Sequence, residues 1–286
     1  MNLPARQRYD RFWKACGCDS TYLPIVMVDS GHRISSGPQD DYQATYRAMV
    51  NAELPRPPRA EIEAYSRRVG SRMRVYARVV NGAATPLSTA RNDATVHALV
   101  WEDARVGVTS RFVRAAPWAG FSTEVADGAT FTTTLETTDL ANVNWSALHT
   151  VVLADYAPGP GPAYDVLQAA VAEPAGLYVE PATVTLAVGG DDPEEASAEL
   201  FIRGPHVLNW TAVTDSSWIT VTPDSGGVGA RPTITVGAAG LVRGWQEGAA
   251  TFTASSEDGM SFAQTVTVRA FLGARPPRRH LARGPR

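Results

Sequence analysis

The chain is 286 residues long, with 44% hydrophobic residues, 19% charged residues and a formal net charge of −3. This length leaves room for two or three domains, and the apolar share is large enough to build folded cores, which excludes a wholly disordered chain. No run of eighteen apolar residues occurs, so we expect no transmembrane segment. Residues 173 to 274 hold four arginines against twelve acidic residues, a net charge of −8, so we expect no nucleic-acid partner.

The first sixty residues have a mixed α/β pattern. Arg6 to Lys14 is a short helical stretch, and the β-branched run from Leu23 to Asp29 predicts a strand. Gly37-Pro38 opens a helix with Asp40 and Asp41 in its first turn. Apolar residues then recur at helical spacing, at Tyr42, Tyr46, Met49, Val50 and Leu54. Three prolines, Pro55, Pro57 and Pro58, end the helix and mark a linker.

From about Ser71 the pattern changes to the alternation of half-buried strands. Turn-rich connectors such as Asn81-Gly82 separate the candidate strands. These lie at 74–80, 95–101, 110–114, 130–135 and 149–155. We expect a β-sandwich over residues 71–172, closed by a short helix from Ala163 to Val171.

Beyond a second boundary at Pro174 to Gly176, seven short strands are expected, with Gly, Asp and Pro between them. They lie at 183–188, 198–202, 209–213, 218–222, 233–236, 249–255 and 262–269. This pattern predicts a second β-sandwich over residues 175–273. The Arg- and Pro-rich end, residues 274–286, has almost nothing to bury, so we expect it to be disordered.

Residues 175–273 resemble the BACON domain, a module of secreted bacterial proteins. The resemblance depends on four segments: Leu177 to Pro181, Leu208 to Ala212, Ser217 to Gly226 and Gly244 to Ser255. It implies a β-sandwich and, through the proteins in which the family occurs, attachment to glycan or mucin.

Three tryptophans of this segment are candidates for sugar contact. Trp210 and Trp218 lie in mid-strand among alternating residues, a position typical of core side chains. Trp245 lies between Gly244 and Gly248 in an expected turn, where its ring would be exposed and could stack on a sugar beside Gln246 and Glu247. The alternative is a ring that folds back over the edge of the sandwich.

The first 170 residues resemble Omp28-related thioredoxin-like proteins. The matching pieces, in order, are Arg6 to Tyr9, Tyr22 to Gly31, Tyr42 to Pro57 and Trp145 to Gln168. The resemblance aligns Pro24 with a cis-proline that faces the active site, and so implies a cis Leu23–Pro24 bond. It begins after the strand and helix that would carry a Cys-x-x-Cys motif, which implies a partial thioredoxin-like remnant over residues 1–60. A lost upstream segment would also account for the lack of a signal peptide at Met1.

Cys16 and Cys18 are the only cysteines. A Cys-Gly-Cys dithiol near Pro24 is a candidate for thiol exchange; exposed thiols or a disulfide that pins a loop are the alternatives. The five histidines are scattered, so we expect no metal site and no cofactor. Asp191 to Glu195 is an acidic turn, a weak calcium candidate or a solvated hairpin tip. No catalytic motif occurs, and we expect no enzyme activity.

The predicted fold class is therefore mainly β, with two Ig-like β-sandwich domains preceded by a partial α/β thioredoxin-like remnant. The favoured function is a non-catalytic, extracellular or cell-envelope protein whose last domain contacts glycan or mucin. Two alternatives stay open: a thiol-disulfide protein with a missing or degenerate redox motif, and a purely structural spacer. The oligomeric state cannot be predicted from the sequence.

Overall fold

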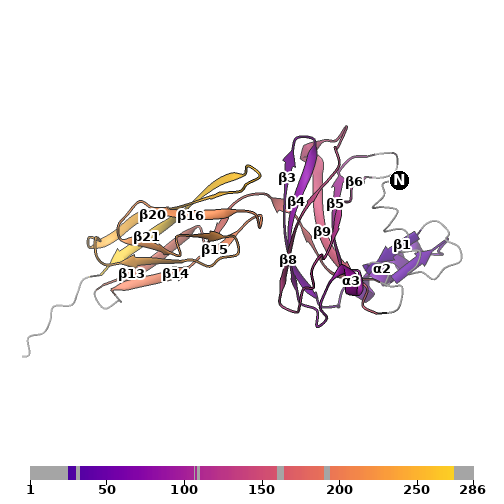
Figure 1. The fold of residues 1–286 in the computed structure, drawn as a ribbon, viewed down its shortest axis with the longest axis horizontal. Coiled ribbons are helices and arrows are strands. Elements are labelled where there is room, and N and C mark those ends of the chain that lie inside the picture. The colour runs from indigo at the N-terminus through magenta and orange to yellow at the C-terminus, as the bar shows by residue number, and fades with distance from the viewer. Residues whose placement is uncertain are drawn as a thin grey trace, which may run out of the picture. The chain divides into compact units, whose positions relative to one another are not determined.

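Figure 1 shows the computed structural model of the chain, which describes residues 25–29, 33–105, 107, 110–159, 164–189 and 194–273. The chain divides after Pro174 into two compact units, called unit 1 and unit 2 below. Strands dominate both units. The mainly β, sandwich-type fold class predicted from the alternating patterns is confirmed.

The described part of unit 1 begins with a small hairpin and a helix. Strand β1 (Ile25–Val28) pairs antiparallel with β2 (Arg33–Ser36), and helix α2 (Tyr42–Glu53) follows. The expected strand and helix are therefore present. Asp41 is the N-cap of α2, and its Oδ1 accepts a hydrogen bond from the Ala44 amide at 2.9 Å. The two acidic residues thus precede the helix instead of occupying its first turn, because a capping carboxylate satisfies an amide that the helix leaves unpaired.

The rest of unit 1 is a two-layered β-structure, whose layers can be followed in Figure 1. One sheet has the order β11-β3-β4-β8, and the other has the order β10-β9-β5-β6 with β7 paired to β5. The strands of the first sheet are β3 (Ala60–Val69), β4 (Arg72–Asn81), β8 (Thr130–Glu136) and β11 (Glu173–Pro174). Those of the second are β5 (Thr95–Glu102), β6 (Phe112–Ala115), β7 (Trp118–Gly120), β9 (Leu148–Tyr156) and β10 (Asp165–Val171). Two short helices, α3 (Thr89–Asn92) and η2 (Trp145–Ala147), lie in the connections.

One hydrophobic core lies between these two sheets. It takes every second residue of the central strands β4 and β5, which are fully buried: Val75, Ala77, Val79, Val96, Ala98 and Val100. Residues two apart on a strand point to the same face, so this alternation in the sequence places one side of each strand in the core.

Two segments of unit 1 differ from the sequence-based expectations. The sheet takes in residues 60–69, because β3 pairs with β4 over ten residues, from Ala60↔Asn81 to Val69↔Arg72. The expected helix at 163–171 is wrong, since its described part forms β10, which pairs antiparallel with β9. Asp165 and Leu167 are buried there on alternate positions. Pairing and burial thus override the helix propensity of the alanines that follow.

Unit 2 is built from strands arranged in three sheets. A five-stranded sheet has the order β13-β21-β20-β16-β18, a three-stranded sheet has the order β14-β19-β17, and β12 pairs with β15. The five-stranded sheet contains β13 (Thr183–Val188), β16 (Asn209–Thr214), β18 (Ser225–Gly227), β20 (Gly244–Ser255) and β21 (Ser261–Leu272). The remaining strands are β12 (Tyr178–Glu180), β14 (Glu195–Glu199), β15 (Phe201–Arg203), β17 (Ile219–Thr222) and β19 (Thr233–Gly237). All the sheet pairings are antiparallel except that of β13 with β21.

The core of unit 2 contains both mid-strand tryptophans. Trp210 on β16 is 1% exposed and Trp218, just before β17, is 8% exposed, so their assignment to the core is confirmed. The Trp210 ring lies 5.6 Å from that of Phe252 on β20, and its Nε1 donates to the Gly227 carbonyl at 2.8 Å. A buried indole needs such an acceptor, so β18 completes the packing of Trp210.

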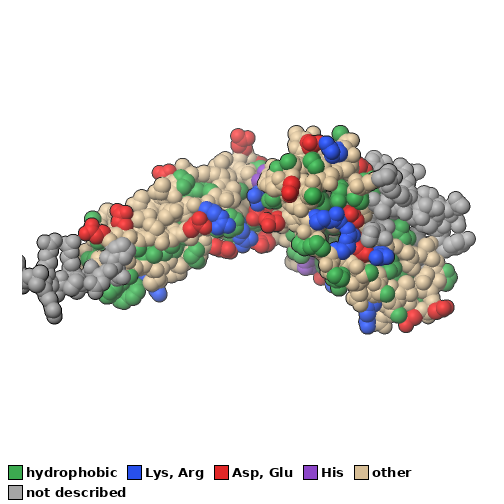
Figure 2. Space-filling view, turned by 90° about the horizontal axis from the view of Figure 1, so that it is seen from below, with side chains coloured by type: hydrophobic (Ala, Val, Ile, Leu, Met, Phe, Trp, Pro, Cys, Tyr) green, Lys and Arg blue, Asp and Glu red, His purple; other side chains and the backbone are tan. Residues whose placement is uncertain are grey.

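Charged side chains of both signs lie interspersed on the face of the molecule seen in Figure 2. Several surface arginines are held in ion pairs, such as Arg72 with Glu136 at 2.9 Å and Arg231 with Glu199 at 2.7 Å. In the described part of the chain, no helix is long and apolar enough to cross a membrane.

Candidate functional site

Of the six site residues predicted from the sequence, three are described by the structure. Cys16, Cys18 and Pro24 lie outside the described residues, as does the Leu23–Pro24 bond, so these predictions stay untested. Most of the acidic turn at 191–195 also lies outside them. Within the ranges that are described, no three His, Cys, Asp or Glu residues are grouped so that they could hold a metal ion.

Trp245 is the second residue of strand β20 and is 65% exposed. The predicted turn at this position is wrong: Gly244 to Gly248 pair with Leu272 to Val268 on β21, and the β20–β21 hairpin is twelve residues long on each side. Glycines normally indicate a turn, but here Gly244 only supplies a left-handed φ of 98° at the start of the strand. A strand gives Trp245 a more rigid attachment than a turn would.

The indole of Trp245 has an aromatic neighbour across the sheet. Trp245 is directly opposite Phe271 on β21, with ring centroids 5.2 Å apart and ring planes at 50°. Such tilted pairs are favourable. Phe271 therefore supports one edge of the indole and leaves much of its surface open to solvent.

The next row of the sheet carries charge. Glu247, two residues after Trp245, is paired with Arg269 on β21 at 3.0 Å, and both side chains are well exposed, at 61% and 58%. Thr185 on β13 is the register partner of Arg269 on its other side. An exposed pair of this kind adds only about 0–1 kcal/mol to stability. The fold therefore depends little on this ion pair, and its hydrogen-bonding groups are accessible at the surface.

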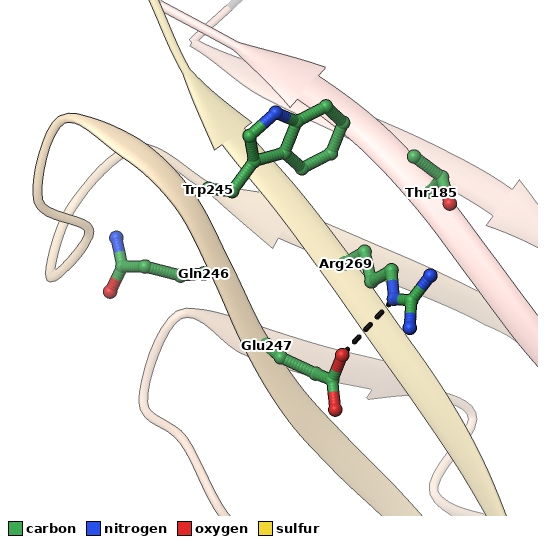
Figure 3. A pocket seen from close by; sticks show the side chains of 5 residues that line it. All are labelled: Thr185, Trp245, Gln246, Glu247 and Arg269. Atoms are coloured by element: carbon green, nitrogen blue, oxygen red, sulfur yellow. Dashed lines mark hydrogen bonds and ion pairs between the residues drawn. The ribbon is translucent and has the colours of Figure 1, made fainter.

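Gln246 differs from the prediction that grouped it with Trp245 and Glu247. In Figure 3 its side chain leaves β20 on the side away from Trp245, Arg269 and Thr185. Its Nε2 donates to the Val242 carbonyl at 2.8 Å. Successive residues of a strand point to opposite faces, so the Gln246 side chain does not lie on the face of β20 that carries Trp245 and Glu247, although Gln246 contributes to the lining of the hollow beside them.

These residues form a shallow hollow of about 400 Å³ at the surface of unit 2. Its lining residues are Thr185, Trp245, Gln246, Glu247 and Arg269. They offer the aromatic face of Trp245, the ion pair of Glu247 with Arg269 and the hydroxyl group of Thr185. None of the five is a nucleophile with an adjacent general base. The hollow is suited to holding a ligand by stacking and hydrogen bonds.

Sequence reasoning missed Thr185, Arg269 and Phe271, which come from two other strands. Their outward positions could be read from the alternation in each strand. Their place opposite Trp245 and Glu247 depends on the register of β13, β21 and β20, which no spacing in the sequence reveals.

The β-sandwich fold of the chain fits a non-catalytic module or a spacer. Residues 176–270 match the family described as the viral BACON domain, which confirms the BACON resemblance of unit 2. No curated protein matches the chain. The comparisons give no support to the thioredoxin-like resemblance of the first 170 residues.

Several solved structures show low similarity to the chain. A Bacteroides ovatus GH5 xyloglucanase in complex with a XXXG heptasaccharide is 22% identical, with a TM-score of 0.25, over 35% of this chain and 19% of that chain. The chain thus spans about a fifth of the length of that enzyme. Titin Ig tandem domains A164-A165 are 12% identical, with a TM-score of 0.23, over 76% of this chain and 98% of that chain. Human CDH23 EC21-23 is 9% identical, with a TM-score of 0.26, over 64% of each chain.

Proposed function

We propose that unit 2 is a non-catalytic module that contacts glycans through the hollow around Trp245. The observation that carries this proposal is the 65% exposed indole, attached to a strand and supported by Phe271 at 5.2 Å. An aromatic face of this kind binds the apolar face of a sugar ring, and the adjacent Glu247, Arg269 and Thr185 supply donors and acceptors for its hydroxyl groups.

The exposure of Trp245 favours a ligand role over a core role. The other two tryptophans of unit 2 are buried, at 1% and 8% exposed. Leaving a large aromatic ring in water forgoes about 1.5–3 kcal/mol of burial energy. A bound sugar would recover part of that energy.

The proposed place of action is outside the cell or at an envelope surface. The matching family is described as viral, and this supports a module that meets glycans of a host surface. In this role unit 2 would attach its neighbouring domains to that surface.

The test is binding of the full chain to an immobilised panel of glycans and mucin, compared with Trp245→Ala. We expect binding that is lost in this variant. Trp118→Ala is the matched control, since Trp118 of unit 1 is also exposed, at 40%, and its loss should leave binding unchanged. Equal binding by the wild type and Trp245→Ala would refute the proposal.

A spacer role is the second candidate, and the division of the chain into two compact units favours it. A spacer needs rigid domains and no ligand. If the chain binds no glycan on the panel and no mucin, the spacer role is the candidate that remains. The thiol-disulfide alternative depends on Cys16 and Cys18, and an insulin-reduction assay of the Cys16→Ser variant against the wild type would test it.

A further inference from the structure

We infer that the ligand of unit 2 is a neutral, unbranched glycan chain that lies along β20 and β21, with one ring on Trp245 and the following rings over rows of threonines. This inference rests on the proposed glycan contact and names the class of glycan. It comes from the whole outer face of the five-stranded sheet, of which the hollow around Trp245 is one end.

Cross-strand register arranges this outer face into rows. Alternate residues of β20 are buried, at Gly248, Ala250, Phe252 and Ala254, so the residues between them face outward. After the rows of Trp245 and Glu247 come three more: Ala249 with Thr267 and Thr183, then Thr251 with Thr265 and Val213, then Thr253 with Thr211 and Ala263. From Trp245 to Thr253 the face extends for about 27 Å, at about 3.4 Å per residue.

These three rows are uncharged and rich in hydroxyl groups. The Oγ1 atoms of Thr211 and Thr253 are hydrogen-bonded at 3.0 Å, and those of Thr251 and Thr265 are hydrogen-bonded at 3.3 Å. A hydroxyl group has one donor and two acceptor positions. Each threonine pair therefore retains acceptors for the hydroxyl groups of a ligand.

The one ion pair in these rows indicates a neutral ligand. Among the described residues of these rows, the one cation is Arg269, which is neutralised by Glu247 at 3.0 Å. An acidic sugar would have to displace that carboxylate.

The shape of the face indicates that the ligand is an extended glycan chain and not a single terminal sugar. The hollow at Trp245 is shallow and lies at the end of the rows, and the threonine rows continue from it along the strand direction. A ligand that binds only at Trp245 would leave these rows unused, whereas an extended chain contacts them in succession.

The test is isothermal titration of the full chain with linear oligosaccharides of two to six sugars. The neutral probes are the glucan, mannan, xylan and chitin series, and oligogalacturonides of the same lengths are the anionic probes. We expect at least one neutral series to gain about tenfold in affinity from the shortest to the longest chain, with no binding of the galacturonides.

Three variants locate the contacts. Trp245→Ala should abolish binding at every length. The double variant Thr251→Val, Thr265→Val removes two hydroxyl groups and keeps β-branched side chains, and should remove the gain with length while leaving disaccharide binding unchanged. The matched control is Ser197→Ala with Thr235→Val, which removes a similar exposed hydroxyl pair, 2.9 Å apart, from the three-stranded sheet.

Two results would overturn this inference and leave the proposed function intact: affinity that does not depend on length, or tighter binding of the galacturonides, each lost in Trp245→Ala. Absence of binding to all the oligosaccharides also overturns it. If the glycan and mucin panel is negative as well, the proposed function fails with it.

Discussion

Gly248 lies against Trp218, so that a Cβ atom placed on Gly248 would be 2.8 Å from Cζ2 of the indole. The same Cβ would be 2.8 Å from Cδ1 of Ile219 and 2.9 Å from Oγ of Ser216. Strand β20 can approach the opposite layer this closely only because residue 248 has no side chain. Gly248 is therefore required for the close packing of the core, whereas an added Cβ at Gly244 would have no atom within 4 Å.

Gly248→Ala should destabilise unit 2 by about 1–3 kcal/mol, since an extra methyl group in a packed core forces its neighbours to move. Urea unfolding followed by tryptophan fluorescence measures the change. Gly237→Ala is the matched control: Gly237 also lies in a strand, and an added Cβ there would have no atom within 4 Å. Equal stabilities of the two variants would contradict the close packing.

Trp210→Ala should lower the free energy of unfolding of unit 2 by about 3–5 kcal/mol, because it removes a buried ring and leaves a cavity. It also removes the donor to the Gly227 carbonyl. Trp245→Ala, in contrast, should change stability by less than about 0.5 kcal/mol, as expected for an exposed side chain. Chemical unfolding of both variants checks this difference, and a similar loss in both would place Trp245 in the core.

Asp165→Asn should destabilise unit 1 by about 2–3 kcal/mol. The carboxylate of Asp165 is 8% exposed and accepts hydrogen bonds from Arg59 at 2.8 Å and from Arg56 at 3.1 Å. Removing its charge weakens the contacts to two partly buried guanidinium groups. Arg56 keeps Asp29 and Glu53 as partners and Arg59 keeps Tyr156, so the cost stays below that of a fully buried pair that loses its partner. Asp103→Asn, whose side chain is 55% exposed, is the control for thermal unfolding. If Asp165→Asn lowers the unfolding temperature no more than Asp103→Asn does, the ion pairs of Asp165 do not stabilise unit 1.

The stability of unit 1 should depend on pH through Glu136. Hydrogen bonds from Arg72 and Arg74 hold the pKa of Glu136 below its usual 4.5. As the pH falls, the unfolded chain takes up this proton first, so the stabilisation is present above about pH 4.5 and is lost as the pH passes through the lower pKa of the folded state.

Glu136→Gln should therefore reduce stability at neutral pH, by no more than about 1 kcal/mol for a partly exposed network, and the difference should shrink in acid. Urea midpoints between pH 7 and pH 3 measure it. Glu124→Gln breaks a more exposed pair with Arg91 and is the control. A difference that grows toward low pH would contradict this account.

Strand positions in unit 2 could be predicted well where one face is buried and the other is polar. Strand β13 has the bounds that the alternation in Thr183 to Val188 predicts. The helix predicted at 163–171 failed because short alanine-containing segments fit either structure, and pairing with β9 decides between them. The exposure of Trp245 is expected from a turn between two glycines, whereas the structure provides it through an outward position on strand β20. The partners of Trp245, which are Phe271 and Arg269, could not be predicted, because their proximity depends on the register of a hairpin.

The parallel pairing of β13 with β21 has a mechanical consequence. β13 lies near the start of unit 2 and β21 at its end, and the two are paired from Thr183↔Thr267 to Val188↔Leu272. Because they run in the same direction, tension between the two ends of the domain pulls these strands past each other lengthwise. All the backbone hydrogen bonds between the two strands then bear the force at the same time. In a pair of strands that is pulled apart from one end, the bonds would instead break one after another. A domain built in this way resists stretching between an anchored end and a pulled end.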